Sequence, residues 1–399
     1  MIRFLTAGES HGQALTAIIE GFPAGLPLSI EAIREDLDRR RQGYGRGGRM
    51  KIENDEVTIL SGVRHGETLG SPIALQIWNK DWERWQKAMS VTPVEGFIKV
   101  EIAGDERLQE LDARVTKARP GHADLAGALK YQQQDLRNIL ERASARETAA
   151  RVAVGAIARQ LLREFGIEVF SGIVRIGAET AYVLPEDLER YRENVGQSPV
   201  ATPDPEASPR MMRAIDRAKA EGDSLGGVIE LLIQGVPPGL GSHVHWERRL
   251  DARLTYALMS IPAIKGVEIG LGFQAAGLPG SEVHDEIFYD TAQGFYRKTN
   301  NAGGIEGGIS NGELIRLRLA MKPIPTLYQP LNTVDIANKQ PAQASVERSD
   351  VCPVPAGAVV AEAMACWVMA DALLEKCGGD HLQEAKTNFI NYLEQIKLK

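Results

Sequence analysis

The order of helical and strand patterns predicts an α+β protein. Three long helices are expected at residues 29–41, 144–166 and 355–379, with short β-rich runs between them in no regular alternation. No G-x-G-x-x-G stretch leads from a strand into a helix, which argues against a doubly wound, dinucleotide-binding sheet.

Two of these helices are predicted from their capping residues. Ser29 can cap a helix that keeps apolar residues on one face as far as Arg41. Ser144 and Glu147 match the S-x-x-E capping box, and small apolar residues at helical spacing follow them until Gly166. Small residues on that face indicate close packing against another helix.

The third helix and the strands are predicted from hydrophobic patterns. The helix that follows Pro355 is apolar nearly all round, so we expect it to be buried on most sides. Apolar and charged residues alternate in ELIRLRLAM at 313–321, as in a half-buried antiparallel strand. Further strands are expected at 57–60, 72–78, 167–176 and 228–234.

Length allows one large globular domain over residues 1–399 or two or three ordinary ones. The chain is 43% hydrophobic, which is ample for a sizeable core. Two stretches are expected to be surface excursions: the polar, tryptophan-rich 79–112 and the proline-rich, irregular 185–209. The formal net charge of -7 means that any phosphate chemistry needs a local basic pocket.

Cysteine usage and the N-terminal sequence predict a cytoplasmic protein. The three cysteines, Cys352, Cys366 and Cys377, are too few and too widely spaced for a disulfide framework. The start of the chain has no apolar run of signal-peptide length, and no run of 18 apolar residues exists for a membrane span.

The stretch TAGESHG at 6–12 is the first candidate site. His11 can carry a proton near neutral pH, because the ordinary histidine pKa is about 6.5. The alternative is a structural turn in which Ser10 and His11 satisfy backbone groups.

The stretch DRRRQGYGRGGRMK at 38–51 is the second. Five arginines lie between positions 39 and 49, separated by four glycines. Arginine offers planar, bidentate donors to phosphate and carboxylate, so we expect a loop that closes over a small anionic substrate. A solvated basic loop and an RNA-binding segment are the alternatives; the acidic chain, without a second basic aromatic segment, argues against RNA.

Three further stretches combine charge with rigid turns. RPGHAD at 119–124 holds Arg119 and His122 between proline and glycine, as acid–base work on a phosphorylated substrate requires. RASARET at 142–148 could bind an anion at a helix start, although capping boxes are usually only structural. In ERSDVC, Asp350 next to Arg348 could be a base that its neighbour keeps ionised. His243 and His245 have no third ligand nearby, so no metal site is expected.

Together these segments closely resemble the chorismate synthase family. The strings GESHG, RRRxGxxR, RPGHAD, RxSARETAxRVAxGAIA, LMSIxAxKGVEIG, NNAGGIEGGIS, KPIPT and RSDxCxVPA occur in that family's order, from residue 8 to about 365. The resemblance implies a 1,4-anti-elimination of phosphate from 5-enolpyruvylshikimate 3-phosphate, which gives chorismate for aromatic amino acid synthesis. It also implies a requirement for reduced FMN without net redox change, with NADPH as an indirect reductant.

The resemblance assigns roles to individual residues. It implies that His11 protonates the leaving phosphate, that His122 lies by the flavin ring, and that Asp350 helps accept the substrate proton. The implied substrate-binding residues are Ser10, Arg40, Arg46, Arg119 and Arg146. The implied flavin contacts are Arg142, Ala143, Ser144, Pro262, Ala263, Gly307, Lys322, Pro323, Ile324, Pro325, Thr326 and Arg348.

The family fold is a β-α-β sandwich, in which helices lie between two largely antiparallel sheets, and the family is usually a homotetramer. No separate nucleotide domain is visible, so we expect a separate flavin reductase or the cell's own reductant to reduce the flavin. A phosphate-ester hydrolase that needs no flavin is the alternative function. We expect neither nucleic acid nor membrane partners.

Overall fold

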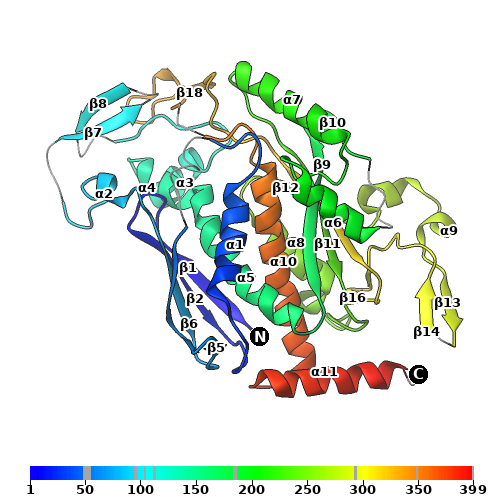
Figure 1. Ribbon diagram of the computed structural model, residues 1–399. Coiled ribbons are helices and arrows are strands. Elements are labelled where there is room, and N and C mark those ends of the chain that lie inside the picture. The colour runs from blue at the N-terminus through cyan, green and yellow to red at the C-terminus, as the bar shows by residue number, and fades with distance from the viewer. Residues whose placement is uncertain are drawn as a thin grey trace.

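The fold is seen in a computed structural model that describes residues 1–47, 55–93, 97–102, 105–110, 114–182, 187–291, 294–346 and 349–397. Two antiparallel sheets stand on either side of a layer of long helices (Figure 1). The α+β prediction is confirmed, because the described strands pair antiparallel within both sheets.

The first sheet comes from the N-terminal part of the chain. Its strand order is β1 (Arg3–Ala7), β2 (Ala14–Glu20), β6 (Ile73–Trp78) and β3 (Val57–Ser61). The strands expected at 57–60 and 72–78 are therefore confirmed. In β6, residues 73, 75 and 77 are buried while their neighbours are more exposed, so one face of this sheet meets the core.

The second sheet comes from the middle of the chain. Its order is β10 (Glu179–Thr180), β9 (Glu168–Ile176), β11 (Gly227–Gln234), β17 (Ile315–Met321) and β12 (Ile264–Ile269). The alternation expected in 313–321 is confirmed in β17, where Ile315, Leu317 and Leu319 are fully buried and the arginines between them are not.

The helical layer consists mainly of α1 (Ile30–Arg41), α5 (Thr148–Arg163) and α10 (Val354–Cys377). α5 contacts β1, β2 and β6, while α10 contacts β9 and β11, and α5 and α10 pack extensively against each other. A Cβ atom added to Gly155 would lie only 2.4 Å from the Cα of Ala363, so the two helices approach backbone to backbone at this point. The predicted close packing of the small residues in α5 is confirmed.

The remaining helices and strands lie around these layers. The helical ones are α2 (Trp82–Trp85), α3 (Asp124–Tyr131), α4 (Arg137–Ala143), η2 (Ala145–Glu147), α6 (Leu188–Gln197), α7 (Ala207–Ala220), η3 (Trp246–Arg248), α8 (Leu250–Met259), η4 (Gly272–Gly277), α9 (Gly280–Val283) and α11 (Leu382–Lys397). The strand pairs are β4 (Val63–Arg64) with β5 (Glu67–Thr68), β7 (Phe97–Ile102) with β8 (Asp105–Glu110), β13 (Ile287–Asp290) with β14 (Gly294–Arg297), β15 (Ile305–Glu306) with β16 (Ile309–Ser310), and β18 (Asn332–Val334) with β19 (Pro341–Gln343).

One predicted cap is confirmed and one is wrong in detail. Ser29 Oγ accepts a hydrogen bond from the Ala32 amide at 3.1 Å, as an N-cap does. Ser144 Oγ instead accepts from the Arg146 amide at the start of the 3-10 turn η2, and the α-helix begins only at Thr148. In a capping box the Glu147 side chain would accept from the Ser144 amide. Here Glu147 Oε2 accepts from Arg151 Nε at 3.1 Å. The S-x-x-E pattern therefore opens a 3-10 turn in this chain.

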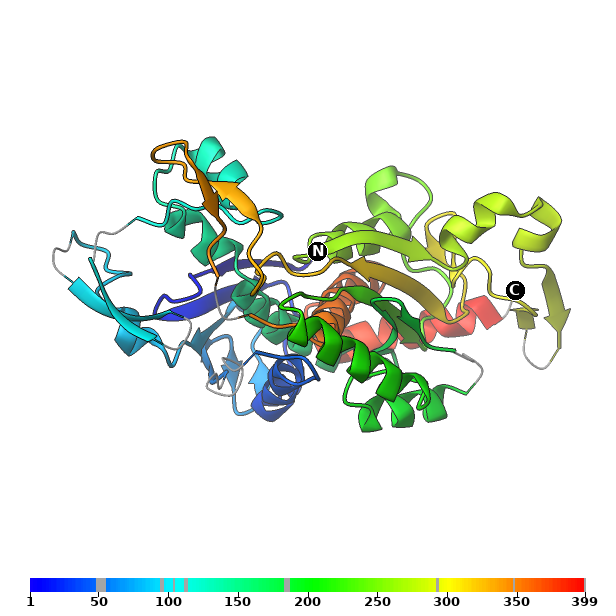
Figure 2. The ribbon, with the colours of Figure 1, turned by 90° about the horizontal axis from the view of Figure 1, so that it is seen from above.

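The two expected excursions contain regular structure. Within 79–112 the structure describes α2 and the β7–β8 hairpin, which projects from one end of the molecule, with β13–β14 at the other end (Figure 2). Within 185–209 the expectation of an irregular stretch is wrong over α6, which Asp187 caps and which buries Tyr191. Three of the prolines in this stretch, at 199, 203 and 205, lie between α6 and α7, where they interrupt no helix.

Helix α10 is long and apolar enough to cross a membrane, but 94% of its most apolar 18-residue window is buried inside the fold. Its side chains contribute to a continuous core that joins both sheets. The all-round apolar pattern is therefore that of a central helix, as predicted.

Candidate functional site

A cavity of about 450 Å³ lies where the two sheets and the helical layer converge. It is lined by the GESHG loop, the end of α1 and the turn after it, RPGHAD, the α4–α5 junction, the segment before β12, the segment after β17, and the start of α10. The residues that the sequence analysis singled out and that line it are Ser10, His11, Arg40, Arg46, Arg119, His122, Ala143, Ser144, Arg146, Pro262, Ala263, Lys322, Ile324, Pro325, Thr326 and Asp350. Segments more than 300 residues apart in sequence thus form one site.

The charges on the cavity wall are strongly unequal. Among the described lining residues, five permanent cations (Arg40, Arg46, Arg119, Arg146, Lys322) face one carboxylate, Asp350. The carboxylates that hold these cations lie mostly behind the wall. A small molecule with several negative charges therefore suits this cavity, although the chain as a whole is acidic.

Glu141 holds His11. The His11 Nδ1 atom lies 2.8 Å from Glu141 Oε1, and the His11 amide donates to Glu141 Oε2 at 2.8 Å. Burial favours the neutral acid at Glu141, but the hydrogen bonds and charge of His11 outweigh it and keep the pKa of Glu141 below its usual value. An ionised carboxylate only accepts hydrogen bonds, so Nδ1 carries a proton and Nε2 is left for the cavity.

Asp124 holds both residues of RPGHAD. His122 Nδ1 lies 2.6 Å from Asp124 Oδ1, and Arg119 Nε donates to Asp124 Oδ2 at 2.8 Å. Although burial raises it, the pKa of Asp124 lies well below its usual range because of the hydrogen bonds from His122 and Arg119. The ring and the guanidinium are therefore fixed against the same carboxylate.

Arg40 and Arg146 share a third carboxylate, Asp55, whose side chain is fully buried. Arg40 Nη1 lies 3.4 Å from Asp55 Oδ2, and Arg146 Nη1 bonds the other oxygen. Arg146 Nε donates to Asn79 Oδ1 at 2.9 Å, and the Asn79 amide donates to Gly12 O at 2.7 Å. Among the described residues, a single carboxylate thus holds two guanidinium groups of the wall.

The described partners of Asp350 come from the arginine-rich turn after α1. Its partners among the described residues are Arg46, whose Nη1 lies 2.5 Å from Oδ2, and the Gly47 amide, 2.7 Å from Oδ1. Arg348, the expected neighbour and flavin contact, lies outside the described residues. The site thus joins the arginine-rich turn after α1 to the segment before α10.

Most of the expected flavin contacts line the cavity, but three described ones do not. Arg142 points away from it and donates to Thr6 O at 3.0 Å and Gly8 O at 3.1 Å. Pro323 lies within the segment after β17 but is not part of the wall. Gly307 lies at the far end of α8, because the neighbouring Gly308 carbonyl accepts from the Leu250 amide.

The wall near Pro262 has an unusual backbone. Ala263 has a φ of +70°, a left-handed conformation that costs a residue with a Cβ some strain. Its carbonyl accepts from the Lys322 amide at 2.9 Å, and Lys322 Nζ donates to Gly121 O at 2.6 Å. These bonds tie the segment before β12, the segment after β17 and RPGHAD together.

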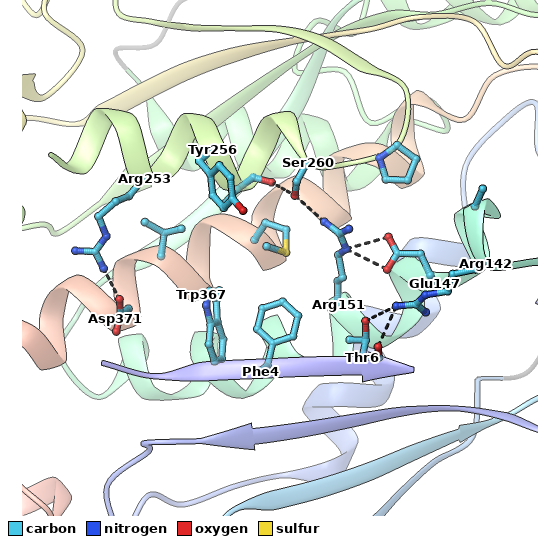
Figure 3. Close-up of a pocket in the computed structure, with 15 residues that line it drawn as sticks. Phe4, Thr6, Arg142, Glu147, Arg151, Arg253, Tyr256, Ser260, Trp367 and Asp371 are labelled. Carbon is cyan, nitrogen blue, oxygen red and sulfur yellow. Dashed lines mark hydrogen bonds and ion pairs between the residues drawn. The ribbon is translucent and has the colours of Figure 1, made fainter. Parts of the chain in front are cut away.

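A second cavity of about 680 Å³ lies beside the first and shares Ala143 and Pro262 with it. Figure 3 shows it between β1 and α8, with Phe4, Trp367 and Tyr256 around it. Two of its three arginines pair with carboxylates, Arg151 with Glu147 and Arg253 with Asp371, while the third is Arg142. Among the described lining residues it has three cations for two carboxylates besides none other, a smaller surplus than that of the first cavity.

Sequence reasoning missed the residues that position the site: Asp55, Asn79, Asp124 and Glu141. Asp124 and Glu141 lie within or next to quoted motifs, so their proximity to histidine and arginine was a usable signal. No such signal marks Asp55 and Asn79, since 91 and 67 residues separate them from their partner Arg146.

Comparison with known proteins agrees with this geometry. A family model described as chorismate synthase matches residues 2–374. The chain is 58% identical to a chorismate synthase of Geobacter sulfurreducens over all of both chains, and 58% identical to one of Moorella thermoacetica over 99% of this chain and 100% of that one. A crystal structure of chorismate synthase superposes with a TM-score of 0.79 at 46% identity and covers 100% of this chain and 99% of that one. The chain therefore belongs to the chorismate synthase family.

Proposed function

We propose that the chain eliminates phosphate from 5-enolpyruvylshikimate 3-phosphate to give chorismate in the shikimate pathway, with reduced FMN as cofactor. It is a lyase, as its family is. The observation that carries the proposal is a cavity with five cations and two carboxylate-held histidines. Two carboxylates and a phosphate on one small substrate match this wall in charge.

The arginines bind and orient the substrate. Arg40, Arg119 and Arg146 are each less than 9% exposed, and Asp55 or Asp124 holds each of them. Their guanidinium groups are therefore oriented before the substrate binds. Ser10, 3% exposed, is fixed by a bond from its amide to Glu141 O at 3.0 Å. Arg46 completes this set from the turn after α1.

The wall also fits a flavin nucleotide. Leu140, Pro262, Met321 and Val360 offer an apolar surface to a flat ring, and Lys322 offers a cation to a phosphate. The described residues that would hold FMN are Ala143, Ser144, Pro262, Ala263, Lys322, Ile324, Pro325 and Thr326. Reduced FMN, when bound, supplies electron density to the substrate as phosphate departs and regains it afterwards.

His11 supplies the proton for the leaving group. With Nδ1 bound to Glu141, the protonated ring can donate only from Nε2 to the phosphate oxygen that gains charge as the C–O bond breaks. His122, whose Nδ1 is held by Asp124, donates from its other nitrogen to the flavin ring. Asp350 helps accept the proton that the substrate loses.

The protein works in the cytoplasm as a homotetramer that binds FMN reduced elsewhere, either by a separate reductase or with NADPH as an indirect source. A surface suited to a second copy lies on β13 and β14, where Ile287, Tyr289 and Phe295 are 60 to 65% exposed. We also propose the β-α-β sandwich of the family; the contacts of α5 with strands of the first sheet and of α10 with strands of the second support it.

Phosphate release from 5-enolpyruvylshikimate 3-phosphate under strict anaerobiosis tests the proposal. One tube contains dithionite-reduced FMN, a second contains oxidised FMN with NADPH, and a third contains no flavin. We expect release in the first tube alone. Release in the second as well would mean that the chain reduces its own flavin. Release in the third would identify the alternative phosphate-ester hydrolase, and no release in any tube would refute the proposed substrate.

A further inference from the structure

A tryptophan outside the cavity wall covers one face of His11. The ring centroids of Trp85 and His11 are 4.1 Å apart with an interplanar angle of 31°, which is a stacked contact. Trp85 lies on α2, in the stretch 79–112, and Figure 1 places this short helix beside α4, which carries Glu141. The contact thus joins a surface segment to a residue of the site.

The indole is itself fixed from two sides. Its Nε1 donates to Asp81 Oδ2 at 3.2 Å, within the same turn of helix. The guanidinium carbon of Arg137 lies 5.1 Å from the Trp85 ring centroid, and Arg137 Nη1 lies 3.5 Å from Glu141 Oε1. His11, Trp85, Arg137 and Glu141 therefore form a closed group in which each member contacts two others.

These contacts restrict rotation of the His11 imidazole ring. Glu141 takes Nδ1, and Trp85 covers a ring face, so the ring cannot rotate without losing a bond or a stacked contact. We propose that Trp85 is a positioning residue for His11, which holds the ring so that Nε2 faces the substrate phosphate. The use of His11 as proton donor rests on the proposed function; the contact itself does not.

Trp82 provides a matched control. It lies on the same helical turn as Trp85 and is also half-buried, but no ring contact to His11 is found for it in the described structure. A general packing role for α2 would make the two tryptophans equivalent. A role through His11 makes only Trp85 matter.

Turnover in a double-mutant cycle tests the role. At saturating substrate and reduced FMN, we expect Trp85→Leu to lower kcat roughly three- to tenfold with KM within about twofold, in line with the strength of aromatic pairs. Trp85→Phe should restore most of the rate, and Trp82→Leu should leave it unchanged. In a His11→Asn background, Trp85→Leu should cost less than about twofold, because its effect passes through His11. An equal loss in both backgrounds would overturn the proposal.

Tryptophan emission of the ligand-free protein tests the contact without any catalysis. An imidazole stacked on an indole quenches its emission, so His11→Asn should raise the emission of the wild type. The same substitution should change nothing in a Trp85→Phe background. An equal rise in both would overturn the contact, even if Trp85→Leu failed to fold. Absence of turnover in the wild type would instead contradict the proposed function and leave the emission result to decide on the contact.

Discussion

Two clusters of arginine and carboxylate lie next to each other in this molecule, and only one of them reaches the cavity wall. The core cluster joins Asp36, Arg39, Arg159 and Glu362 between α1, α5 and α10. The cavity cluster joins Arg40, Arg146 and Asp55. Counting the described residues, the first has two cations for two carboxylates, and the second has two cations for one.

The core cluster is closed. Arg159 bonds both carboxylates at 2.8 to 2.9 Å and donates to Val169 O at 2.6 Å, while Ser171 Oγ donates to the second oxygen of Glu362 at 2.6 Å. Its members are absent from the cavity wall among the described residues. The arginines of the cavity cluster line the cavity, where a bound anion can meet them. Arg39 and Arg40 are adjacent in sequence, yet one stabilises the fold and the other belongs to the site.

The largest expected effect comes from breaking the core cluster. Glu362→Gln should lower the free energy of unfolding by about 3–5 kcal/mol, because it removes one of the two carboxylates that face the buried Arg159. Denaturant unfolding measures this loss, and the folded fraction should keep its KM. Glu375→Gln, on the same helix but 37% exposed, should change stability by at most about 1 kcal/mol. Equal losses in both variants would show that burial does not decide how much an ion pair of α10 contributes to stability.

The next effect belongs to the cavity. His11→Ala should lower kcat roughly a hundredfold or more, the usual contribution of a positioned general acid. Its thermal midpoint should stay within a few degrees of the wild type, because His11 lies at the cavity wall and outside the apolar core. Steady-state kinetics under flavin saturation, with calorimetry as the control, measures both. An undiminished rate would remove His11 from the mechanism.

A smaller effect is expected from the ion pair of Arg46 and Asp350, which joins the turn after α1 to the segment before α10. Arg46→Ala should raise KM and lower kcat about tenfold each, because Arg46 both faces the substrate and holds Asp350. Adding Asp350→Asn should cost little beyond the larger single loss, since the two residues act as a pair. Fully multiplicative losses would mean that the pair in the ligand-free protein has no role in turnover.

The smallest effect is expected from alkylating agents, which should not modify the three buried cysteines of the folded protein. Burial raises the pKa of Cys352 and of Cys366 to about 12, so both remain protonated at pH 8 and react poorly. Cys377, with a pKa of about 11 for the same reason, should behave alike. Iodoacetamide at pH 8 should leave all three thiols unmodified in the folded protein, and mass spectrometry checks this. Modification before unfolding would reveal local opening near α10.

The sequence predicted the elements better than the links between them. Alternation in β17 and apolar spacing in α5 and α10 depend on neighbouring residues, and the structure confirms all three. Periodicity could not separate Arg39 from Arg40, since the partners that decide their roles, Glu362 and Asp55, lie 323 and 15 residues away. The family resemblance named Arg40 for the substrate, but it did not name Asp55. Long-range pairing of polar side chains has no local signature, and that explains why Asn79 was missed as well.

The close approach of α5 and α10 at Gly155 has a consequence for variation in this protein. Both helices begin at the cavity, with Thr148 on one and Gly357 on the other, so their spacing sets the width of the site. Gly155 lies seven residues beyond Thr148, about 10 Å along the helix. A larger side chain at Gly155 would increase the distance between the two helices and alter catalysis without contacting any ligand. Selection is thus expected to remove substitutions at this helix contact as strictly as substitutions at the two histidines of the cavity, although no chemistry takes place at the contact.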